Sequence, residues 1–167
     1  MLEVNDNFLE KKSENGNINK KELFEQGMSA LNFCRPFEAI KYFSLLKEER
    51  NSAISFNIAL CYLKIKKYDT VLLYLQKALS EIKRNRNIKV PENDYLELLN
   101  FEEENESYKK PMLYLTPFQF PDLAKDQILR LMIDILFILE KKEEMYKVID
   151  SLKNKNYKNI KTKIGRG

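Results

Sequence analysis

The chain has 167 residues, of which 44% are hydrophobic and 32% charged, and its formal net charge is +4. This composition is typical of a globular domain, and so mild a charge does not by itself indicate a nucleic-acid-binding protein. The sequence contains no His, so the commonest general base and the commonest metal ligand are both missing. Cys34 and Cys61 lack a CxxC spacing and are too few for a disulfide framework. We therefore expect a cytoplasmic protein with two partly buried, inert thiols, no metal site and no cofactor.

Residues 1–18 are polar and contain an Asn-Gly pair, which predicts a disordered N-terminal arm. The arm has no apolar core, so we expect no signal peptide. The longest apolar run, residues 128–139, is interrupted by Arg130 and Asp134 and is too short and too charged to span a bilayer.

Residues 20–83 predict four helices. The first should run over about 20–33, because its apolar residues follow one face of a helix. Pro36 suits the first turn of a second helix, and Asn51 or Ser52 can cap a third. A fourth is expected over about 68–83. Small side chains recur about 30 residues apart in these helices, a period that favours stacked helix pairs. They are Gly27, Ala30, Ala39 and Ala59, with the slightly larger Val71.

The regularity stops after residue 83. Residues 92–106 carry seven acids with apolar residues at helical spacing, which predicts a short acidic amphipathic helix with a solvated charged face. The three prolines in residues 111–121 argue against a regular helix and predict an extended apolar segment. Asp122 can then cap a fifth helix to about Leu139, and a sixth is expected over 143–153. The basic segment 156–167 is predicted to fray as a tail.

The segments 20–50 and 52–83 resemble tetratricopeptide repeats, because their small and bulky residues alternate as in that family's 34-residue pattern. Residues 126–153 fit the pattern as a degenerate third unit, with Ile133, Met145, Ile149 and Leu152 at the corresponding positions. The resemblance implies an all-α stack of helix pairs over residues 19–155, with an insert at about 84–121. It also implies a non-catalytic protein-binding scaffold.

In such a scaffold the first helix of each pair forms an inner, concave surface. The resemblance assigns to this surface Phe24, Met28, Leu31, Asn32, Phe56, Asn57, Leu60, Leu63, Lys64, Gln127, Arg130, Asp134 and Phe137. The partner-binding residues expected among them are Phe24, Met28, Phe56, Asn57, Leu60 and Lys64. The family's chaperone-tail clamp needs Lys and Asn residues of which only Asn57 is matched, so we reject that ligand. The apolar groove favours an apolar or amphipathic protein or peptide partner.

Three alternatives remain for this groove. It can be open to a partner, it can mediate homo-oligomer formation, or the tethered segment 112–120 can cover it. Asp134 can pair with Arg130, one helical turn earlier, or it can anchor a basic group of a ligand.

The function that we expect is a non-catalytic interaction module that binds a partner segment in the concave groove. One alternative is an adaptor that binds RNA or the ribosome through its basic C-terminal tail. Another is a small chaperone of secreted proteins built on the same fold. An enzyme is not expected, because the chain has no nucleophile–base pair, metal-ligand cluster or glycine-rich phosphate loop.

Overall fold

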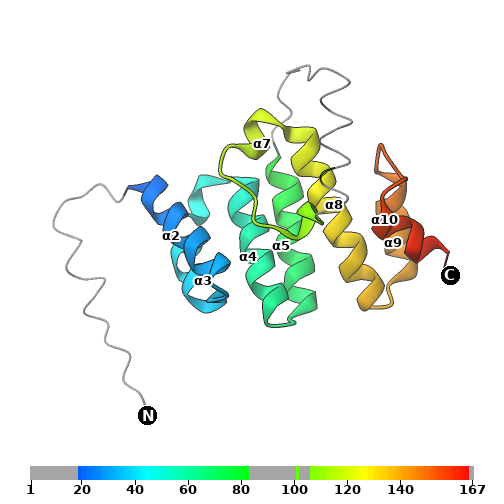
Figure 1. The fold of residues 1–167 in the computed structure, drawn as a ribbon, viewed down its shortest axis with the longest axis horizontal. Coiled ribbons are helices and arrows are strands. Elements are labelled where there is room, and N and C mark those ends of the chain that lie inside the picture. The colour runs from blue at the N-terminus through cyan, green and yellow to red at the C-terminus, as the bar shows by residue number, and fades with distance from the viewer. Residues whose placement is uncertain (1–18, 83–100, 102–105, 166–167) are drawn as a thin grey trace, which may run out of the picture.

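The computed structural model describes residues 19–82, 101 and 106–165. Within these ranges every regular element is helical, and eight α-helices pack against each other (Figure 1). They are α2 (Lys20–Asn32), α3 (Pro36–Ser44), α4 (Ser52–Lys64), α5 (Tyr68–Glu81), α7 (Thr116–Gln119), α8 (Pro121–Ile138), α9 (Lys142–Asp150) and α10 (Lys158–Ile164). Two 3₁₀ turns, η1 (Lys47–Glu49) and η2 (Ser107–Lys109), complete the described elements. The predicted N-terminal arm lies outside the described residues, as does almost all of the predicted acidic helix.

Three helix pairs share one turn geometry. The turns between α2 and α3, α4 and α5, and α8 and α9 each place one non-glycine residue in the left-handed region: Cys34 at φ 56°, Lys66 at φ 58° and Glu140 at φ 57°. In each turn the N–H of the next residue donates to a carbonyl five residues back, as Arg35 does to Ala30 at 2.8 Å. Lys67 makes the same bond to Tyr62, and Lys141 makes it to Leu136. This is a recurrent helix C-terminal motif, and it turns the chain back along each helix.

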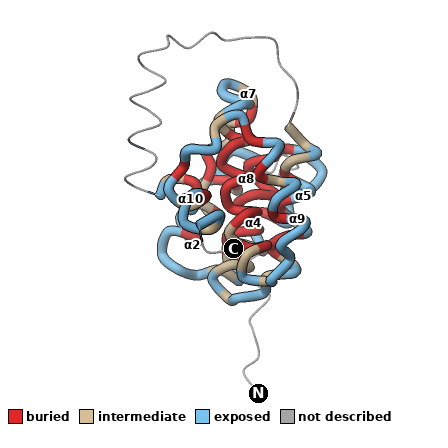
Figure 2. The backbone as a smooth tube through the Cα atoms, turned by 90° about the vertical axis from the view of Figure 1, so that its right-hand side faces the viewer, coloured by how far each residue is buried: buried red, intermediate tan, exposed pale blue. Residues whose placement is uncertain are grey.

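The pairs pack side by side in the order in which they occur along the chain. Helix α3 packs on α4, and α5 packs on α8, so the second pair is followed in space by the third although residues 82–120 separate them in sequence. Figure 2 shows that burial is concentrated along α4 and α8, the two helices with neighbours on several sides. In α4, the first ten residues, Ser52–Cys61, are all buried.

The small residues of the repeat are buried, and one of them lies directly against a neighbouring helix. Ala39, Ala59 and Val71 are each fully buried. At Gly27, an added Cβ would lie 2.6 Å from Cε1 of Phe43, inside the van der Waals contact distance. The space between α2 and α3 is therefore filled by the Phe43 ring, and only a glycine leaves room for it.

The predicted helix positions are confirmed for residues 20–81, and Asn51 is the cap of α4, since its Oδ1 accepts a hydrogen bond from the N–H of Ala53 at 2.9 Å. Two predictions for the later segment are wrong. Residues 111–121 are not extended throughout, because Thr116–Gln119 form one helical turn with Pro117 near its start. Helix α8 begins at Pro121, with Phe120 rather than Asp122 at the cap position, because a proline in the first turn needs no N–H partner.

The predicted frayed tail is also wrong for residues 157–164. Helix α10 packs on α8 and buries Tyr157 and Ile160, which leave only 2% and 0% of their surfaces exposed. These two apolar anchors hold the segment on the domain despite its basic character. Cys61 is buried as predicted, but Cys34 is exposed because it occupies the turn itself.

Candidate functional site: an inner face covered by its own chain

The inner surface predicted from α2, α4 and α8 is covered by residues 107–115, which we name the strap. In Figure 1 the chain between η2 and α7 runs across α4 and α5. Of the three alternatives for the groove, the structure therefore has the one in which the chain covers it. Met112 is 2% exposed and Tyr108 is 1% exposed, so the strap inserts side chains as well as lying on the surface.

Side-chain amides of the inner face hold the main chain of the strap. Asn57 makes a two-point contact with Met112: its Oδ1 accepts from the Met112 N–H at 2.8 Å, and its Nδ2 donates to the Met112 carbonyl at 2.9 Å. Two residues further along, the Tyr114 carbonyl accepts from Nδ2 of Asn51 at 3.0 Å. At the other end, Nε2 of Gln127 donates to the carbonyl of Lys110 at 3.0 Å and to that of Ser107 at 3.2 Å. Three amides on two helices thus pair the backbone of a segment that has no strand partner.

The strap alternates between buried and exposed side chains. Met112 belongs to the hydrophobic core, and the Tyr114 ring meets the edge of Phe24 at a centroid distance of 5.2 Å. Leu113 and Leu115 point outward and are 66% and 53% exposed. The alternation does not come from a regular strand, because Tyr114 and Leu115 lie in a turn in which the Thr116 N–H donates to the Leu113 carbonyl at 3.1 Å.

The predicted partner-binding residues are only partly brought together as an accessible site. Phe24, Phe56, Asn57 and Leu60 are buried, with 5% of the surface or less exposed, and Met28 is half-buried with its sulfur 3.2 Å from Nδ2 of Asn57. Lys64 is exposed. The strap contacts two of the four buried residues directly, Phe24 through Tyr114 and Asn57 through Met112.

A second cluster anchors the beginning of the strap to α8 and α10. The Arg130 guanidinium is 1% exposed and lies between two tyrosine rings, 4.2 Å from the centroid of Tyr108 and 4.0 Å from that of Tyr157. Cation–π contacts of this kind gain strength when they are removed from water. One ring comes from the strap and the other from the segment leading into α10, so one α8 residue links both.

Asp134 completes this cluster. One carboxylate oxygen accepts from the Tyr108 hydroxyl at 2.8 Å, and the other accepts from Asn159 Nδ2 at 2.9 Å and from Lys163 Nζ at 2.6 Å. Burial, together with this carboxylate, raises the pKa of Tyr108 far above its usual value, so its hydroxyl remains a donor. The sequence predicts that Asp134 pairs directly with Arg130 or with a ligand's basic group; in the structure Lys163 supplies the basic group, and Asn159 bridges the two residues, with its Oδ1 accepting from Arg130 Nε at 3.3 Å.

Sequence reasoning missed Tyr108, Tyr114 and Asn159 as members of the inner face. Their signal was weak, because none lies in a helix that shows the repeat pattern. Gln127 was assigned to the inner face, but its hydrogen-bond partners could not be named from the sequence. Asn51 was identified only as a helix cap, although an Asn that caps with its oxygen still has an amide group to donate.

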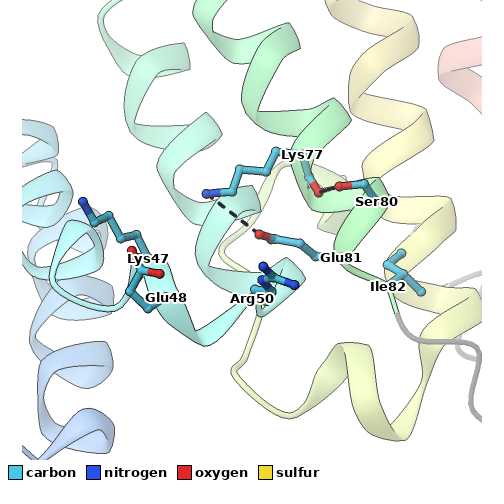
Figure 3. A pocket seen from close by; sticks show the side chains of 7 residues that line it. All are labelled: Lys47, Glu48, Arg50, Lys77, Ser80, Glu81 and Ile82. Atoms are coloured by element: carbon cyan, nitrogen blue, oxygen red, sulfur yellow. Dashed lines mark hydrogen bonds and ion pairs between the residues drawn. The ribbon is translucent and has the colours of Figure 1, made fainter.

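A separate pocket of ≈ 540 Å³ lies between η1 and the end of α5 (Figure 3). It is lined by Lys47, Glu48, Arg50, Lys77, Ser80, Glu81 and Ile82. Lys77 pairs with Glu81 at 3.8 Å, and the Ser80 hydroxyl donates to the Lys77 carbonyl at 2.7 Å. The pocket carries charges of both signs and has no convergent set of polar groups that indicates a ligand, so it supports no assignment.

Among the described residues there is no group of three or more acidic, Cys or His side chains placed to bind a metal ion. Across the same ranges, no helix has both the length and the apolar character needed to traverse a bilayer. Comparisons of the chain with protein-family models, curated proteins and solved structures found no match.

Proposed function

We propose that this chain is a non-catalytic protein-binding module of the tetratricopeptide type, whose inner face binds an extended segment of a partner. The three repeated turns and the small residues at the helix crossings support the repeat architecture. The observation that carries the binding role is the two-point contact between Asn57 and the backbone of Met112.

A side-chain amide that pairs both the N–H and the C=O of one residue recognises main chain rather than any particular side chain. Any extended polypeptide offers the same two groups with the same spacing. The face therefore has the chemistry of a peptide-binding surface, and the strap is its resident ligand.

A partner has to displace the strap, and the strap is a strong competitor because it is tethered. For a short tether the effective concentration is in the millimolar range. Competition from the strap therefore lowers the affinity of the wild-type chain for a partner segment. Changes that weaken the contacts of the strap should raise this affinity. The proposed function therefore predicts tighter binding when the strap is weakened.

The test uses the full chain with Met112→Ser and Tyr114→Ser, which we name the released variant. Its probe is a fluorescein-labelled peptide of residues 109–117, KKPMLYLTP, followed by fluorescence anisotropy. The released variant should bind the peptide at least about tenfold more tightly than the wild type, and adding Asn57→Leu should abolish binding. Asn156→Leu, at an exposed position outside the inner face, is the matched control and should leave the affinity unchanged.

Circular dichroism decides whether the released variant keeps its helices. A released variant that is unfolded would show that the strap is a permanent part of the core, and would refute the proposed function. A folded released variant that does not bind the peptide would refute it as well.

The alternative as an RNA or ribosome adaptor has less support. Lys163 in the tail pairs with Asp134, and Lys153 and Lys155 just before the tail pair with Asp122 and Asp150, so carboxylates offset part of the positive charge on which that hypothesis depends. Steep salt dependence of RNA binding would be its signature.

A further inference from the structure

The contacts made by the side chains of the strap indicate which side chains the inner face would accept from a partner. The inference drawn from them rests on the proposed function. We infer that the partner segment has an unbranched apolar residue, such as Met, followed two positions later by an aromatic residue, with an unrestricted residue between them. The contacts of the strap at three successive positions carry this assignment.

The first position is that of Met112. Asn57 bonds both the N–H and the carbonyl of Met112, which fixes the direction of the Met112 side chain. Only 2% of the surface of Met112 is exposed to solvent. Met28, whose sulfur lies 3.2 Å from Nδ2 of the same Asn57, is packed against the hydrophobic core to which Met112 belongs, so the surroundings of Met112 are largely apolar. A flexible unbranched side chain fits such an irregular space better than a β-branched one, and a charged side chain would be buried without a partner.

The third position is that of Tyr114. Its ring packs edge-on against Phe24 at 5.2 Å and lies 6.2 Å from Phe118, so two aromatic neighbours define the space. Its carbonyl is held by Asn51, which fixes the distance between the two recognised residues. Edge-to-face pairs favour an aromatic ring over an aliphatic side chain of similar area by about 0.5–1.5 kcal/mol.

The middle position is that of Leu113, which is 66% exposed. It lies between the buried Met112 and the half-buried Tyr114, and its own side chain is directed to solvent. Polar and apolar side chains should be tolerated equally there.

The partner segment belongs to a different protein rather than to a second copy of this chain. A second copy would offer the same sequence that the tethered strap already supplies, without the advantage of the tether, so exchange between copies gains no contact.

The experiment compares three peptides on the released variant: KKPMLYLTP, the peptide with Ser at the Met112 and Tyr114 positions, and the peptide with Ser at the Leu113 position. We expect the doubly substituted peptide to bind at least about tenfold more weakly and the Leu113-substituted peptide to bind within about twofold of the original. A tenfold loss at the middle position would overturn the assigned pattern.

Failure of this inference is distinguishable from failure of the proposed function. Equal binding of all three peptides would show that the face binds main chain without selecting these side chains, which overturns the inference and leaves the proposed function standing. Absence of binding by all three would overturn both.

Two measurements on the wild-type chain complete the test and do not depend on the released variant. An excess of KKPMLYLTP should accelerate hydrogen exchange at the Met112 amide, which is protected by Asn57, at least several-fold, whereas the doubly substituted peptide should not. Equal exchange with the two peptides would contradict the inference. Light scattering should give a monomer, and a dimer that dissociates when the peptide is added would overturn the assignment to a foreign partner.

Discussion

Gly27 offers the sharpest test of the helix-pair packing on which the inner face depends. In Gly27→Ala, the new Cβ would lie 2.6 Å from Cε1, 2.8 Å from Cζ and 2.9 Å from Cδ1 of Phe43. The ring cannot simply move away, because Phe43 has no exposed surface and its ring packs against Phe24 at a centroid distance of 5.6 Å.

Two effects of opposite sign decide the magnitude. Replacing a helical Gly by Ala stabilises a helix by about 1 kcal/mol. Overpacking a closely packed core costs about 1–3 kcal/mol, and a contact against the side of a fixed ring belongs at the upper end of that range. We therefore expect Gly27→Ala to lower the free energy of unfolding by about 1–2 kcal/mol, measured by urea denaturation.

A double-mutant cycle isolates the contact. Phe43→Leu should destabilise the protein by itself, but it removes the atoms that clash, so Gly27→Ala should become neutral or stabilising in that background. Gly165→Ala is the surface control, since the atom nearest to the added Cβ would be the Lys161 carbonyl oxygen at 3.4 Å, an ordinary contact. If Gly27→Ala is as stable as the wild type, or if its cost persists beside Phe43→Leu, the packing argument is refuted.

Three further outcomes are expected. Asn159→Ala should lower the free energy of unfolding by about 1–3 kcal/mol, because it removes the amide that bonds Arg130 and Asp134 of α8. The control Asn156→Ala, at an exposed site, should leave the free energy of unfolding unchanged. Equal stabilities of the two variants in urea would contradict the clustered contacts. Cys34 should react rapidly with Ellman's reagent, and Cys61, whose burial raises its pKa to about 12, should react only after unfolding; two fast thiols in the folded chain would contradict the burial of Cys61. Burial raises the pKa of Asp126, although a tyrosine hydroxyl bonded to it acts in the opposite direction. Its contribution to stability is therefore present below about pH 4 and is lost as the pH rises through the folded-state pKa. Asp126→Asn should accordingly gain stability relative to the wild type between about pH 4 and 7 in thermal unfolding, and a pH-independent difference would contradict this.

Much of the helical framework could be predicted from local sequence. Apolar residues at helical spacing gave the positions of α2 to α5, since each helix buries one face whatever its neighbours are. The cap at Asn51 and the proline at the start of α3 follow the chemistry of helix ends, which involves only adjacent residues. The small residues at positions 27, 39, 59 and 71 likewise indicated close helix crossings, because no other packing explains them as well.

The sequence by itself determined the positions of the helices over residues 20–81 and left three alternatives for the inner face, one of them a cover formed by residues 112–120. The tertiary structure decided among these alternatives and showed which side chains hold the covering segment. The bond between Asn57 and Met112 joins residues 55 positions apart, and no periodicity in either segment specifies such a partner. Tyr108 precedes α8 and Tyr157 follows α9 in the sequence, yet both rings pack on Arg130. No local pattern specifies this contact either. Helices are encoded by nearby residues, whereas the path of a segment without repeated hydrogen bonds depends on side chains that only the complete fold brings together.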